Sequence, residues 1–183
     1  CVLFFKKQFS KIQVHYHKII LGAIILTASL VILPQLYGDG YHAIKHGILS
    51  ANTDALTLPL VLTVVASLIM KPIVTSITLS AGGDGGVFAP SLFIGAFLGL
   101  LTALCVNTFF NANVIPLNFM IIGMAAMLSA SIHAPFTALF LVCGVVNDYT
   151  LFFPILLVCL VSKYTAQKFY PFTVYSYKET LAK

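Results

Sequence analysis

The sequence has few charged residues and no arginine. Only 8% of its 183 residues are charged and 60% are hydrophobic, whereas about a quarter of a soluble globular domain is charged. All 10 basic residues are lysines, so the guanidinium group, which binds phosphates through paired hydrogen bonds, is absent. These deficits argue against a soluble domain and against a nucleic-acid partner, and they predict a protein that lies within a lipid bilayer.

Cysteine is also scarce. The sequence has 4 cysteines without paired spacing, and Cys105, Cys143 and Cys159 lie in apolar runs, where a thiol behaves as a small hydrophobic group. His42 and His46 lie four residues apart, but two ligands are too few for a typical zinc site. We therefore expect no disulfide, no metal site and no cofactor.

Charge is distributed as in a membrane protein. From Gly85 to Ser162 the only formally charged side chain is Asp148, and Ile19–Gly38 is long enough to cross a hydrocarbon layer of about 30 Å. Lysines cluster near both ends of the chain, and by the positive-inside rule both ends should face the cytoplasm. We expect an integral, multi-pass membrane protein whose host membrane the sequence leaves open. The chain begins at Cys1 without a preceding signal pattern, which favours a segment of a longer chain.

Proline and glycine divide the apolar sequence into helices, several of them shorter than the roughly 20 residues of a perpendicular span. A break is expected at Lys71-Pro72, because proline removes a helical hydrogen bond. Gly95 and Gly99 should let a neighbouring helix approach closely. Residues 1–183 are expected to form a single transmembrane unit of about eight helices. The expected helices are Ile19–Gly38, Tyr41–Leu49, Ala55–Met70, Ile73–Leu79, Phe88–Val106, Leu117–Ser131, Ala134–Val146, Thr150–Ala166 and a short final segment, with a polar loop over Asn107–Pro116.

A glycine-rich turn over residues 82–86 leads directly into Val87, Phe88, Ala89 and Pro90. A helix N-terminus leaves about four backbone N–H groups without an intrahelical partner and carries roughly half a positive charge. The glycines permit a sharp entry and Pro90 suits a first helical turn, so the amides of Val87 and Phe88 could point at an anion. A plain connector between two packed helices is an equally good interpretation of these residues.

The segment Gly86-Val87-Phe88-Ala89-Pro90 resembles the G-x-F-x-P motif of the CLC chloride channels and chloride/proton antiporters. Residues 34–41, Ala130–Thr137 and Val174–Ser176 resemble further segments of that family in the same order. The resemblance covers essentially the whole chain. It implies an all-α membrane protein with a CLC-type bundle of tilted, broken and re-entrant helices, in which this chain supplies the C-terminal half, the second of two inverted repeats.

The resemblance also implies a function. It predicts voltage-gated chloride transport rather than enzymatic catalysis, in a homodimer whose subunits each have a pore. The implied partners are chloride, the lipid bilayer, a second copy and the N-terminal half of the same chain. The acids that separate channels from antiporters belong to that half. The residues implied to bind the anion are Gly86, Val87, Phe88, Ala89, Pro90 and the hydroxyl of Tyr175.

Two residues depart from the family pattern. Gly144 stands where the family commonly has glutamate, which removes a polar anchor near a helix end. Asp84 lies in the glycine turn, where a small uncharged residue is more usual, and we expect its carboxylate to face solvent or a cation. His133 is expected to satisfy the backbone at a helix start, and Asp148 to cap a helix.

Two alternatives remain at the level of sequence. Asp84 and Asp148 could form the carboxylate pair of an intramembrane aspartyl protease, although the protease motif would need glycine where the chain has Ala81. The chain could also be a truncated half without transport activity of its own. Chloride flux in liposomes separates transport from both.

Overall fold

The computed structural model describes residues 15–32, 58–81, 86 and 88–173, in which every regular element is an α-helix. This confirms the predicted all-α class. The described helices fall into two compact units, one with α2 and α4 and the other with α5, α6, α7 and α8. The helix expected over Tyr41–Leu49 and the segment from Val174 onward lie outside the described residues.

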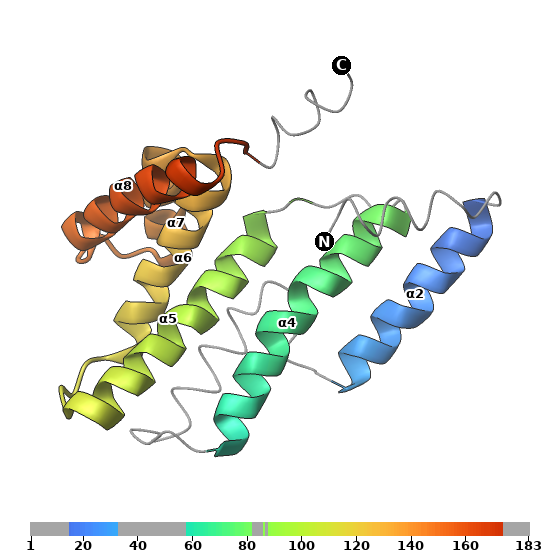
Figure 1. Cartoon of the computed structure of the whole chain (residues 1–183), viewed down its shortest axis with the longest axis horizontal. Coiled ribbons are helices and arrows are strands. Elements are labelled where there is room, and N and C mark those ends of the chain that lie inside the picture. The colour runs from blue at the N-terminus through green and yellow to red at the C-terminus, as the bar shows by residue number, and fades with distance from the viewer. Residues whose placement is uncertain (1–14, 33–57, 82–85, 87, 174–183) are drawn as a thin grey trace. The chain divides into compact units, whose positions relative to one another are not determined.

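The first unit pairs α2 (His15–Ile32) with α4 (Leu58–Ala81), which run in opposite directions (Figure 1). Gly22 allows the close approach, because a Cβ atom added there would lie 2.6 Å from the Cβ of Ala81. Apolar side chains fill the contact beside it: Ile25, Ile73, Ile77 and Ala81.

Helix α4 is continuous through Pro72, so the predicted break at Lys71-Pro72 is wrong. An interior proline costs about 3 kcal/mol, but interrupting the helix would free several backbone groups at several kcal/mol each in an apolar environment. Side chains supply polar contacts beside the proline. Thr75 donates its hydroxyl to the Lys71 carbonyl at 2.8 Å, and Ser76 donates to the Pro72 carbonyl at 2.6 Å.

In the second unit, α5 (Phe88–Phe110) and α6 (Pro116–Ile132) form an antiparallel hairpin with backbone in contact with backbone. A Cβ atom on Gly95 would overlap the carbonyl of Gly123, and one on Gly99 would overlap the carbonyl of Phe119. The predicted close approach at Gly95 and Gly99 is confirmed.

Helix α5 extends one turn beyond the predicted end at Val106, into the expected polar loop. Asn107 explains the difference. Its side-chain nitrogen donates to the Val114 carbonyl at 2.9 Å, and its side-chain oxygen accepts the Val114 N–H at 2.7 Å. This clamp folds the connection back over Asn111 and Asn113, both with a φ of 48°, so only residues 111–115 separate the helices.

Two further helices complete the second unit, α7 (Pro135–Val146) and α8 (Phe152–Phe169). The predicted breaks at residues 133–135 and 147–149 are confirmed. Helix α8 is held to α6 by side-chain hydrogen bonds to backbone carbonyls. Ser129 donates to Cys159 at 2.7 Å, Cys159 donates to Ala125 at 3.5 Å, and Ser162 donates to Ala126 at 2.7 Å.

Proline marks the beginning of each helix from α4 to α8. An N–H group is not needed in the first helical turn, and the fixed φ of proline suits it. The sequence therefore specifies where these helices begin. The prolines within the first three helical residues are Pro59, Pro90, Pro116, Pro135 and Pro154.

Candidate functional site

The start of α5 has the features of an anion-binding helix end. Phe88 is the first helical residue and Pro90 the third, and the first turn has no acidic side chain. The positive end of the helix dipole is therefore not neutralised by an acid in its own first turn. Ala89 is exposed, while Phe88 and Pro90 are half-buried.

The structure covers part of the predicted anion site. Gly86 is described and exposed, and Phe88, Ala89 and Pro90 form the first turn of α5. Val87 and Tyr175 lie outside the described residues, as does Asp84 with the rest of the glycine turn. The predicted helix start is in place, and the predicted coordination by the amides and the phenol stays a prediction.

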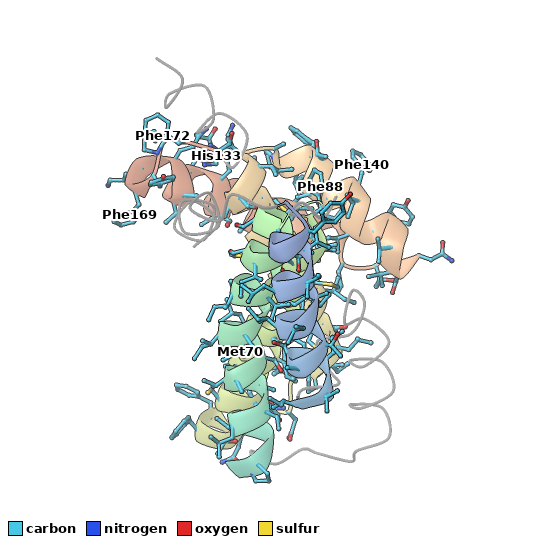
Figure 2. The ribbon with its side chains drawn as sticks, turned by 90° about the vertical axis from the view of Figure 1, so that its right-hand side faces the viewer. Met70, Phe88, His133, Phe140, Phe169 and Phe172 are labelled. Atoms are coloured by element: carbon cyan, nitrogen blue, oxygen red, sulfur yellow. The ribbon has the colours of Figure 1, made fainter. Side chains whose placement is uncertain are left out.

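Three segments of the second unit lie on the same side of it. Figure 2 shows Phe88, His133 and Phe172 at one end of this unit, so the start of α5, the α6–α7 junction and the chain after α8 lie there. The rings of Tyr170 and Phe172 pack edge to face, with their centroids 5.8 Å apart. Phe172, close to the end of the described chain, thus lies on the side where α5 begins.

His133 ends α6 instead of starting a helix. It adopts the left-handed conformation with a φ of 57°, and its backbone N–H donates to the Ser129 carbonyl at 2.9 Å. The predicted role at a helix start is therefore wrong, because His133 caps the C-terminus of α6 with its own backbone N–H. Ala134 follows, and Pro135 then starts α7.

Asp148 lies in the exposed connection between α7 and α8. Its carboxylate accepts the Thr150 N–H at 2.8 Å and the Thr150 hydroxyl at 2.5 Å. These hydrogen bonds, the hydroxyl first, lower the pKa of the Asp148 carboxyl below its usual value. The predicted helix cap is wrong, because Leu151 is the N-cap of α8 and no side chain caps that helix. Asp148 instead closes a turn before α8, and the turn stabilises the ionised carboxylate.

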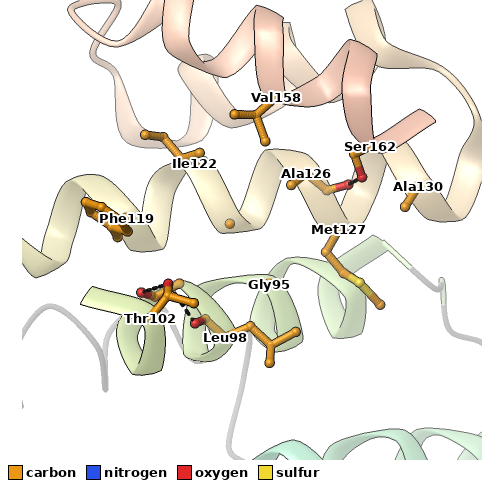
Figure 3. A pocket seen from close by; sticks show the side chains of 12 residues that line it. Gly95, Leu98, Thr102, Phe119, Ile122, Ala126, Met127, Ala130, Val158 and Ser162 are labelled. Atoms are coloured by element: carbon orange, nitrogen blue, oxygen red, sulfur yellow. Dashed lines mark hydrogen bonds between the residues drawn. The ribbon is translucent and has the colours of Figure 1, made fainter. Parts of the chain in front are cut away.

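A groove of about 300 Å³ lies between α5, α6 and α8 (Figure 3). Its walls are small and apolar residues, among them Gly95, Gly123 and Ala130. Its two hydroxyls already donate to carbonyls, Thr102 to Gly99 at 2.7 Å and Ser162 to Ala126 at 2.7 Å. Because both side-chain hydroxyls of the lining are already used in this way, the groove offers an anion no free side-chain donor and does not fit the anion site.

The other predicted positions are structural in the described chain. Cys143 and Cys159 are buried and free, as expected for small hydrophobic side chains, and Cys105 is exposed and free. Gly144 is exposed, with no atom within 4 Å of an added Cβ. Within the described ranges, no three histidine, cysteine or acidic side chains gather as metal ligands would.

Sequence reasoning gave Lys71 no function, yet its side chain is only 8% exposed. It is the single charged side chain of α4. A lysine at the centre of a transmembrane helix costs about 3 kcal/mol on insertion scales. An isolated lysine within the apolar run from Ala55 to Leu79 was the signal that could have revealed it.

Two described helical segments are long and apolar enough to cross a membrane, Val61–Ala81 and Phe88–Phe110.

A family profile described as voltage gated chloride channel matches residues 1–167. A Ralstonia nicotianae protein named as a ClcB-like chloride channel protein is 31% identical over 150 residues, which cover 81% of this chain and 33% of the relative. The voltage-gated ClC-type chloride channel ClcB of Escherichia coli O139:H28 is 27% identical over 157 residues, 85% of this chain and 36% of the relative.

The chain thus spans about a third of the length of these curated relatives. A family of chloride channels gives no support to the aspartyl protease alternative, whose second acid, Asp148, is bound to Thr150. The profile match covers all of the described helices from α2 to α7 and most of α8. The chain belongs to the CLC family of voltage-gated chloride channels.

Proposed function

We propose that this chain forms the C-terminal half of a chloride pore and supplies the start of α5 to its anion site. The observation that carries the proposal is the family motif, Gly86 to Pro90, at the beginning of an apolar helix without a first-turn acid. Family membership supports anion transport. The helix dipole supplies the physical reason, since it favours an anion at this end.

The proposed site uses neutral donors. The amides of Val87 and Phe88 and the hydroxyl of Tyr175 replace part of the water shell of a chloride ion. Neutral donors bind the ion firmly enough to dehydrate it and weakly enough to release it, which conduction requires. Gly86 and Ala89 have small side chains, so an ion can approach the backbone closely. Pro90 fits the first helical turn, where no N–H donor is needed.

The proposed assembly is a homodimer with a pore in each subunit. Residues 1–183 act as one multi-pass transmembrane unit, the second of two inverted repeats, and pair with the N-terminal half of the same chain. The two candidate spans support a membrane location, and the coverage of only about a third of each relative supports a pore that needs further segments. Without that other half, we expect residues 1–183 to conduct no chloride.

The test isolates a single backbone donor. Phe88→Pro removes the amide hydrogen and the ring, and Phe88→Ala removes the ring alone. Proline fits the first position of a helix, so both variants of the full-length protein should fold. Losing a hydrogen bond to a charged group costs about 1.5–3 kcal/mol, which predicts chloride flux in liposomes roughly tenfold to a hundredfold lower for Phe88→Pro than for Phe88→Ala.

Tyr175→Phe supplies the second arm. It removes the hydroxyl and keeps the ring, so flux should fall and chloride selectivity should weaken. Equal flux in Phe88→Pro and Phe88→Ala, with both proteins monodisperse, would contradict the role of α5. Wild-type protein without chloride flux would contradict the proposed function as a whole.

A further inference from the structure

Lys71 occupies the centre of a candidate transmembrane span. The span runs from Val61 to Ala81, which puts Lys71 ten residues from each end, or about 15 Å at the rise of an α-helix. Its side chain is 8% exposed. Figure 2 shows the neighbouring Met70 midway along this helix. A cation therefore lies buried near the middle of the apolar stretch.

Lys71 does not fit the usual role of a lysine at a membrane surface. Such lysines lie near helix ends, with the apolar stem on the protein and the ammonium in the headgroup region. The Lys71 side chain is much shorter than the distance to either end of the span. An ionisable residue in this position faces the protein interior or a polar cavity and marks an ion path by default.

Hydroxyl groups continue the polar face of α4 toward its N-terminus. Thr63, Ser67 and Lys71 follow one another at four-residue intervals and so share one face. Ser67 is fully buried. Ser67 and Lys71 are therefore two buried polar side chains one turn apart on this face, with the buried Val64 and Val74 to either side.

The ammonium is the donor best suited to an anion at this depth. Beyond Lys71, the hydroxyls of α4 donate to carbonyls one turn earlier in the same helix, as Thr75, Ser76 and Thr78 do. Lys71 also interacts within the protein, but an ammonium has three N–H donors and can bind a protein group and an anion together. The paired helix α2 has no ionisable side chain from Ile19 to Ile32.

We propose that Lys71 forms a second anion-binding position, which attracts small monovalent anions such as chloride into the transport path through α4. This inference rests on the proposed function and adds a residue outside the α5 motif. Even at a separation of about 10 Å and an effective dielectric constant of about 20, a unit charge changes the affinity of an ion roughly tenfold, so we expect the Lys71 charge to have at least this effect on an ion bound near it. The ammonium thus lowers the chloride concentration needed to saturate transport.

The experiment measures chloride flux against chloride concentration for the full-length protein in liposomes. Lys71→Met keeps the length of the side chain and removes its charge, and we expect its half-saturating chloride concentration to rise roughly tenfold. Lys71→Arg keeps the charge and should stay within about twofold of wild type. A merely structural lysine would change the melting temperature and leave the half-saturating concentration unchanged in Lys71→Met, which would overturn the proposal.

Lys71→His tests the charge within one folded protein. Histidine gains its charge near pH 6.5, so the ratio of its half-saturating concentration to that of wild type should fall as the pH drops from 8 to about 5.5. A ratio that stays constant over this range would overturn the proposal even if Lys71→Met fails to fold. If wild type transports chloride and the Lys71 variants have the same half-saturating concentration, this inference alone is wrong. If wild type transports no chloride, this inference and the proposed function are both wrong.

Discussion

Helices α4 and α5 are both apolar and long enough to cross a membrane, yet they use that length differently. The span in α4 has a buried lysine at its centre and a proline one residue later. In contrast, α5 has no charged residue and keeps its proline in the first turn. A charged group thus lies inside one helix, whereas the other helix is uncharged along its whole length.

The two proposals give these helices different means of attracting an anion. In the proposed α5 site the positive potential would come from the helix end, so the helix body is free to pack backbone against backbone at Gly95 and Gly99. In the proposed α4 position it would come from the ammonium of Lys71. Four predictions test this contrast, in order of decreasing effect.

Gly99→Ala should have the largest effect, because the added Cβ would overlap the backbone of α6 at Phe119 and Met120. We expect the free energy of unfolding of the full-length protein to fall by about 3 kcal/mol, measured by chemical denaturation in detergent. Gly144→Ala is the matched control. No atom lies within 4 Å of the new methyl group there, and better helix propensity should stabilise the protein by about 0.5–1 kcal/mol. Equal effects would refute the packing account of α5.

Pro72→Ala should stabilise α4 by about 2 kcal/mol, because it restores the hydrogen bond that an interior proline removes. Pro90→Ala is the control, since a first-turn proline breaks no helical bond, and its free energy of unfolding should change by less than about 0.5 kcal/mol. Denaturation midpoints of both variants give the measurement. A Pro72→Ala protein no more stable than Pro90→Ala would show that α4 has adapted fully to its proline.

Ser129→Ala should destabilise the second unit by about 1 kcal/mol, because the buried hydroxyl donates to the Cys159 carbonyl in α8. Ser131→Ala removes a hydroxyl that bonds within its own helix, to Leu128, and should be nearly neutral. Thermal unfolding of the two proteins side by side decides the point. A larger loss in Ser131→Ala would mean that the hydrogen bonds between α6 and α8 contribute little.

The smallest effect concerns pH and Asp148. Its pKa is lowered by the Thr150 hydroxyl and N–H, so its contribution to stability is present above the unfolded value of about 3.9 and is lost as pH falls through the lower folded value. Melting temperatures of wild type and Asp148→Asn should therefore converge as pH drops from 6 to 3. A difference that is constant over this range would contradict the turn assigned to Asp148.

Local chemistry made part of the fold predictable. Pro90 and Pro135 marked helix beginnings, and Gly95 with Gly99 marked a close helix contact, because both signals act within one turn of the chain. Longer-range effects escaped prediction. The extra turn of α5 depends on Asn107 bonding to Val114, seven residues away, and α4 stays whole because the membrane penalises a break more than a proline.

The candidate site was predictable to a similar degree. The motif from Gly86 to Pro90 correctly indicated where α5 begins, since glycine and proline have strong local preferences. The lysine of α4 was read only as the end of a helix, and its burial depends on tertiary packing that a single sequence does not display. The breaks after α6 and α7 were predicted, but the left-handed conformation of His133 and Asn147 was not, because neither residue is glycine.

The most direct test of the account is to locate the bound anion. We would crystallise the full-length protein in bromide, which substitutes for chloride and scatters anomalously, and compare wild type with Phe88→Pro. The account predicts an anomalous peak at the start of α5, in contact with the amide of Phe88 and the hydroxyl of Tyr175, that weakens in the variant. A wild-type protein whose bromide sites all lie away from this helix start would contradict it.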